Sequence, residues 1–108
     1  MKLGFIGTGK IASSVITGIC KSTIRYNQIL ISERNRKISG QLKKNYKKIK
    51  IFKNNQEIID KSDWVFLSVT PEVGKKIIKT LNFRSEQTII SFISTINLAD
   101  LKKNIKVR

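Results

Sequence analysis

The stretch GFIGTGKIASSVITGI, residues 4–19, decides how this chain folds. It opens as an apolar run, passes through glycines at positions 7 and 9, and continues with apolar residues at helical spacing. Three of the six glycines of the chain fall within its first nine residues. A glycine turn between a strand and a helix lets backbone N–H groups approach a ligand closely, because no side chain intervenes. The stretch therefore predicts a strand, a ligand-binding turn and a helix.

The turn carries the pattern G-x-G-x-x-A, formed by Gly7, Gly9 and Ala12, between the predicted strand 2–6 and the predicted helix 10–21. In this pattern the first glycine permits the tight turn, the second lets the backbone approach a pyrophosphate, and the small third residue keeps the helix close to the sheet. The helix N-terminus then offers free N–H groups and its positive dipole end to the phosphates. The alternative is a tight turn that binds nothing. The residues predicted to hold a dinucleotide here are Ile6, Gly7, Thr8, Gly9, Lys10, Ile11 and Ala12.

The rest of the chain alternates between strand and helix patterns. We expect strands at 28–32, 49–52, 63–69 and 87–93, helices at 35–48, 54–62, 71–81 and 97–105, and the start of a sixth strand at 106–108. Such alternation predicts one α/β domain over residues 1–108, with a doubly wound, mostly parallel sheet of the Rossmann type. In such a sheet ligands bind at the carboxyl ends of the strands, where the strand order reverses.

The composition limits the other functions. The net charge of +15 arises mainly from lysines spread along the chain, so it indicates a solvated surface and weak adhesion to polyanions rather than specific nucleic-acid binding. The chain has no histidine and a single cysteine, which excludes imidazole catalysis, a zinc site and an internal disulfide. The sequence contains neither a signal-peptide pattern nor an apolar run of membrane-spanning length. We therefore expect a cytoplasmic protein that does not enter a membrane.

The residues after the second predicted strand bear on the choice of dinucleotide. They read SERNRK, residues 32–37. The hydroxyl of Ser32, the guanidinium of Arg34 and the helix N-terminus at Asn35 together suit the 2′-phosphate of NADP; Asn35 is also a plausible helix cap. Glu33 keeps NAD as an alternative, because a carboxylate at this place would bond the ribose hydroxyls. The sequence favours NADP.

These motifs together resemble the N-terminal domain of the pyrroline-5-carboxylate reductases, over essentially all 108 residues. The stretches that carry the resemblance are GFIGTGKIASSVITG, ILISERN, SDWVFLSVTPE and TIISFISTINLADL. The chain departs from the family at Lys10 and Ile11, where Asn and Met are frequent, and at Thr70, where Lys is usual. Ser94 and Thr95 replace smaller residues. Imine, hydroxyacid and prephenate-type dehydrogenases share this nucleotide-binding half.

The resemblance implies hydride transfer from NADPH to the C=N carbon of 1-pyrroline-5-carboxylate, giving L-proline. It places Asn55 near the adenosine end of the cofactor and no catalytic side chain in this chain. It further implies that the ribose and nicotinamide are flanked by Val69, Thr70 and Pro71. The place where nicotinamide and substrate meet would be bordered by Ser94 and Thr95.

In the family a second, helical domain follows the sixth strand, forms the homo-oligomer and supplies most of the substrate pocket. The chain stops before such a domain, so we expect residues 1–108 alone to bind NADP(H) without reducing the substrate. A module that binds NADP without catalysis is the alternative of a different class, and a basic nucleic-acid-binding domain is a weaker one.

Overall fold

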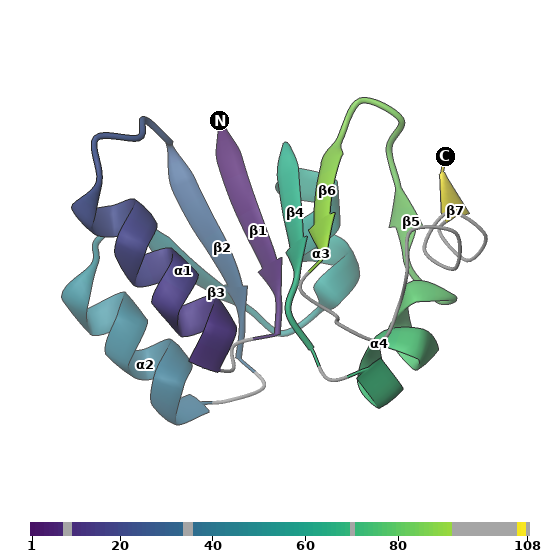
Figure 1. Cartoon of the computed structure of the whole chain (residues 1–108), viewed down its shortest axis with the longest axis horizontal. Coiled ribbons are helices and arrows are strands. Elements are labelled where there is room, and N and C mark those ends of the chain that lie inside the picture. Colours follow the sequence, from purple (N-terminus) through teal and green to yellow (C-terminus); the bar gives the residue numbers. More distant parts are fainter. Residues whose placement is uncertain (8–9, 34–35, 70, 92–105, 108) are drawn as a thin grey trace.

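The computed structural model describes residues 1–7, 10–33, 36–69, 71–91 and 106–107, and its centre is a five-stranded parallel sheet (Figure 1). The strand order is β3–β2–β1–β4–β6, with every neighbouring pair parallel. The strands are β1 (Lys2–Ile6), β2 (Gln28–Ser32), β3 (Ile49–Phe52), β4 (Trp64–Leu67) and β6 (Thr88–Ser91). The chain runs outward from β1 to β3 and then returns to β4 on the other side of β1. The strand order therefore reverses between β1 and β4.

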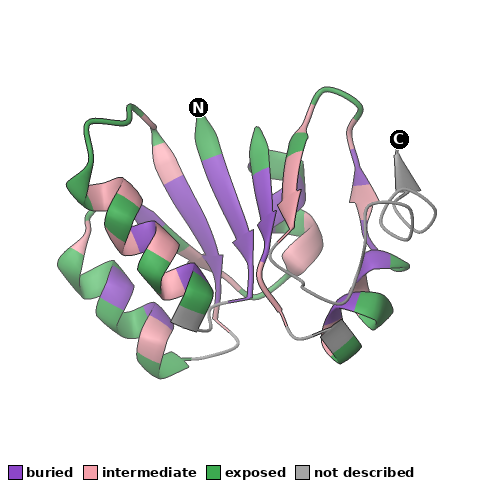
Figure 2. Cartoon of the chain, in the orientation of Figure 1, coloured by how far each residue is buried: buried purple, intermediate pink, exposed green. Residues whose placement is uncertain are grey.

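Helices cover both faces of this sheet. On one face, α1 (Lys10–Lys21) and α2 (Arg36–Asn45) pack over a core that includes Phe5 and Phe66, whose rings stack with centroids 4.4 Å apart. On the other, α3 (Asn55–Lys61) and α4 (Pro71–Ile78) pack over a second core. The middle strands are buried along most of their length (Figure 2) because each face is covered. The predicted doubly wound α/β fold is confirmed.

The carboxyl-terminal part differs from the sequence-based expectation. A short strand β5 (Asn82–Phe83) was not predicted, and β7 (Lys106–Val107) pairs with it in parallel, in a separate two-stranded sheet rather than as a sixth strand of the main one. Two residues are too few to show the alternation that marks a strand. The predicted helix 97–105 lies outside the described residues.

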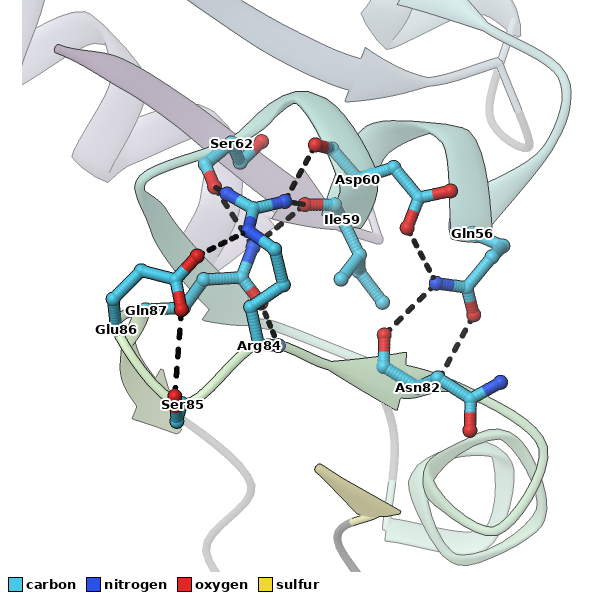
Figure 3. A network of polar contacts seen from close by, with 9 residues as sticks. All are labelled: Gln56, Ile59, Asp60, Ser62, Asn82, Arg84, Ser85, Glu86 and Gln87. Carbon is cyan, nitrogen blue, oxygen red and sulfur yellow. Dashed lines mark hydrogen bonds and ion pairs between the residues drawn. The ribbon is translucent and has the colours of Figure 1, made fainter. Parts of the chain in front are cut away.

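Polar side chains fix β5 and the turn after it against α3 (Figure 3). The Gln56 side chain accepts from the backbone N–H of Asn82 at 2.9 Å and donates to its carbonyl at 2.8 Å. The Arg84 guanidinium donates to the carbonyls of Asp60 at 2.5 Å and Ser62 at 2.8 Å. These carbonyls lie at the end of α3, where a helix leaves its C=O groups without helical partners. The network therefore has a structural role, ending α3 and orienting β5.

Gly4 in β1 allows α3 to approach the sheet closely. We therefore predict that a side chain at this position destabilises the fold. A Cβ at position 4 would lie 2.1 Å from the Ser62 Oγ and 2.8 Å from the Ile58 Cγ2. Replacing Gly4 with Ala is expected to lower the free energy of unfolding by about 1–3 kcal/mol through overpacking. Chemical denaturation measures this loss. The matched control is Gly18→Ala in α1, where a Cβ meets nothing within 4 Å and where alanine favours the helix. Equal stabilities of the two variants would contradict the prediction.

Candidate functional site

The glycine turn lies at the point where the strand order reverses. Gly7 follows β1 with φ of 97°, the left-handed region that glycine adopts readily. A Cβ at this position would come within 2.6 Å of the Ser68 carbonyl oxygen and 2.7 Å of the Val69 Cγ1. The Ser68 N–H donates to the Ile6 carbonyl at 2.9 Å, which continues the pairing of β1 and β4 past the strand ends. The turn is therefore packed directly on the residues that follow β4.

The start of α1 agrees with the predicted start of the helix after the glycine turn. The helix begins at Lys10, and the Ala12 and Ile6 side chains are fully buried, as close packing of the helix on the sheet requires. Ile11, predicted as a cofactor-binding residue, is 56% exposed on the first turn of α1. Thr8 and Gly9 lie outside the described residues.

The tip of β2 forms the second part of the candidate site. Ser32 ends the strand with only 7% of its surface exposed, and its carbonyl accepts a hydrogen bond from the Ser39 hydroxyl in α2 at 2.7 Å. The Glu33 N–H donates to the Phe52 carbonyl at 3.1 Å, so the backbone stays paired with β3 for one residue more. Arg34 and Asn35, predicted to read a 2′-phosphate, lie outside the described residues.

Three of the remaining predicted residues follow the ends of β3 and β4. Asn55 is the first residue of α3 and is half-buried, whereas the neighbouring Asn54 caps that helix by accepting from the Glu57 N–H at 3.2 Å. Val69 is half-buried against the core beneath α4. Pro71 is the first residue of α4, which confirms the predicted helix start. Thr70, Ser94 and Thr95 lie outside the described residues.

Sequence reasoning missed two residues at this edge of the sheet, Ser39 and Ser68. The Ser68 hydroxyl lies 3.2 Å from the carbonyl oxygens of Ile6 and of Gly7. Ser68 lies within the apolar strand pattern 63–69, and Ser39 lies within the helical pattern 35–48. A polar residue within each of these patterns was the only indication of their role that the sequence offered.

The described part of the site consists mainly of backbone groups, hydroxyls and apolar side chains. Within the described ranges no cluster of three or more His, Cys, Asp or Glu side chains could hold a metal ion. Burial raises the pKa of Tyr26 to about 12, with a further contribution from its hydrogen bond to the Cys20 thiol, but Tyr26 precedes β2 at the opposite edge of the sheet.

None of the helices in the described ranges is long and apolar enough to span a membrane.

A comparison with models of protein families assigns the chain to a family of oxidoreductases. The family of NADP oxidoreductases described as coenzyme F420-dependent matches residues 2–95, which include the glycine turn and the ends of β2 and β4. The chain belongs to this family. The description of this family names NADP, which is the cofactor predicted from the sequence.

Individual relatives support the resemblance to the pyrroline-5-carboxylate reductases. The chain is 29% identical to the enzyme of Arabidopsis thaliana over 105 residues, covering 94% of this chain and 38% of that protein. It is 31% identical to the enzyme of Pseudomonas aeruginosa over 107 residues, covering 94% of this chain and 37% of that protein. The chain thus spans well under half the length of these curated relatives.

Two solved structures share the fold. The 1-pyrroline-5-carboxylate reductase of Streptococcus pyogenes superposes with a TM-score of 0.80 at 32% identity, covering 98% of this chain and 39% of that one. The pyrroline carboxylate reductase of Plasmodium falciparum, solved with NADP bound, also gives 0.80, at 21% identity over 98% of this chain and 38% of that one. The second likeness is one of fold alone. Together these comparisons confirm the resemblance inferred from the sequence.

Proposed function

We propose that this chain is the dinucleotide-binding part of an NADPH-dependent reductase that converts 1-pyrroline-5-carboxylate to L-proline, in proline biosynthesis. The observation that carries the proposal is the left-handed Gly7 turn, packed on the end of β4 where the strand order reverses. Its membership of an NADP oxidoreductase family and its similarity to pyrroline-5-carboxylate reductases support the choice of reaction. We further propose that residues 1–108 form one domain of a cytoplasmic homo-oligomer that takes a small-molecule substrate and no specific nucleic acid.

The described residues fit a dinucleotide. The glycine turn has no room for a side chain at Gly7, and α1 begins three residues later. Both observations support the proposal that the first N–H groups of α1 bind phosphate. In the proposal the residues around the turn hold the pyrophosphate, Ser32, Arg34, Asn35 and Asn55 hold the adenosine end, and the ends of β4 and β6 border the nicotinamide. Bound NADPH supplies the hydride. The contribution of this chain is to bind and orient, since positioning is what hydride transfer requires of the protein.

Titrating the purified protein with NADPH and with NADH tests the proposal. Cofactor fluorescence or calorimetry gives the two dissociation constants, and the SERNRK sequence at 32–37 predicts tighter binding of NADPH. Equal affinities, or tighter binding of NADH, would contradict the predicted preference. Failure to bind either dinucleotide would contradict the proposed function itself.

A substitution at Arg34 separates recognition of the 2′-phosphate from general attraction. Arg34→Ala is expected to weaken NADPH binding by about 1.5–3 kcal/mol, the range for a hydrogen bond to a charged group, and to leave NADH nearly unchanged. The matched control is Arg25→Ala, which removes the same charge from an exposed position before the amino end of β2. If Arg34→Ala weakens both cofactors alike, or if Arg25→Ala has the same effect on NADPH, Arg34 does not read the 2′-phosphate.

A further inference from the structure

The hydroxyls of Ser39, Ser62 and Ser68 donate to backbone carbonyls near the ends of strands of the main sheet. Ser39 donates to the Ser32 carbonyl at 2.7 Å, Ser62 donates to the Ile58 carbonyl at 2.6 Å, and the Ser68 hydroxyl lies 3.2 Å from two carbonyls of the glycine turn. Ser39 and Ser68 act at the carboxyl ends of β2 and β1. Ser62 precedes β4 and therefore lies at the opposite, amino edge.

Ser68 fixes the entry to the glycine turn from the side of β4. Ile6 and Leu67 are register partners, and Ser68 follows Leu67 directly. Its N–H and its hydroxyl both reach the Ile6 carbonyl, and the same hydroxyl reaches the Gly7 carbonyl. The Gly7 carbonyl belongs to the planar peptide unit that leads into the turn, so holding this oxygen fixes the direction in which the turn departs.

Ser39 bonds the carbonyl at the end of β2, as Ser68 bonds the carbonyl at the end of β1. Its side chain is 1% exposed and its hydroxyl reaches out of α2 to the carbonyl of Ser32, seven residues earlier, although a helical serine often bonds within its own helix. This hydrogen bond joins α2 to the end of β2. Ser32 directly precedes Glu33 and Arg34, the residues from which the sequence predicts the choice between NAD and NADP.

We infer that Ser39 and Ser68 are positioning residues of the dinucleotide site, which act through the backbone and make no contact with the ligand themselves. The inference rests on the proposed function. Ser68 sets the turn that faces the pyrophosphate, which NADPH and NADH share, so its loss weakens both. Ser39 sets the connection after β2, where the two cofactors differ, so its loss changes the ratio of their affinities.

The experiment measures the dissociation constants of NADPH and NADH for the wild-type protein and for Ser68→Ala, Ser39→Ala and Ser62→Ala. Removing one positioning hydrogen bond is expected to weaken binding by about three- to tenfold. Ser68→Ala shows this loss for both cofactors, and Ser39→Ala shows it for NADPH more than for NADH. Ser62→Ala, which removes a fully buried hydroxyl of the same kind at the other edge, lowers the melting temperature and leaves both constants unchanged.

Two further variants separate positioning from general destabilisation. Ser68→Thr keeps the hydroxyl and restores binding to within about twofold of the wild type. Ser68→Cys keeps the size of the side chain with a weaker donor and loses affinity as the alanine variant does, which provides a measurement if that variant unfolds too early.

Unchanged affinities in Ser68→Ala or Ser68→Cys, an unchanged ratio in Ser39→Ala, or an equal loss in Ser62→Ala would overturn the inference. Any of these results in a protein that binds NADPH would leave the proposed function intact. A wild-type protein that binds neither cofactor would overturn both.

Discussion

Replacing Gly9 with valine is expected to abolish dinucleotide binding, with at least about a hundredfold rise in the dissociation constants of both NADPH and NADH, while the domain stays folded. The G-x-G-x-x-A pattern assigns to the second glycine the place where the backbone meets the pyrophosphate, and a branched side chain there takes the space of the phosphates. Because the pyrophosphate is common to both cofactors, the loss does not depend on the 2′-phosphate.

Calorimetry with each cofactor measures the loss, and a thermal melt of the same sample shows that the variant is folded. The matched control is Gly18→Val, which places the same side chain in α1, at a position where a Cβ meets nothing within 4 Å. It should bind both cofactors as the wild type does. A folded Gly9→Val variant that still binds NADPH would show that the turn does not hold the phosphates.

Residues 1–108 are expected to bind NADPH and yet to show no measurable reduction of 1-pyrroline-5-carboxylate. These residues correspond to 36–38% of the length of the curated relatives, and the resemblance assigns most of the substrate pocket to a second, helical domain. Holding the two reactants in a reactive arrangement contributes roughly 7–11 kcal/mol to such a reaction. A polypeptide that holds the cofactor without the substrate gains none of this contribution.

A steady-state assay that follows NADPH absorbance in the presence of the substrate tests this expectation. The reductase of Pseudomonas aeruginosa, assayed in parallel, serves as the positive control. NADPH binding is measured on the same preparation, so that inactivity is not confused with a failure to bind cofactor. Turnover in the ordinary enzymatic range, about 1–1000 s⁻¹, would show that the site is complete within these residues.

Local patterns were enough to predict the framework of the site. The apolar run before Gly7 and the apolar spacing after it predicted β1 and α1 with the bounds that the structure has, 2–6 and 10–21. Pro71 predicted the start of α4, because a residue without an N–H suits the first turn of a helix. In each case the signal lies within a few residues of the feature that it predicts, so it can be read from sequence alone.

The tertiary structure decided how these pieces meet. β5 pairs with β7 and is held against α3 by Gln56, which lies 26 residues before Asn82 and bonds both its N–H and its carbonyl. No local pattern in the sequence predicts these contacts. The serines behave in the same way: the Ser68 hydroxyl contacts the turn at Gly7 across 61 residues of sequence. By itself the sequence determined where the strands of the main sheet, the helices α1 to α4 and the glycine turn lie, since these follow from short-range periodicity and backbone preference. Which side chains hold the strand ends in place depends on contacts between residues distant in the chain, which exist only once the sheet has formed.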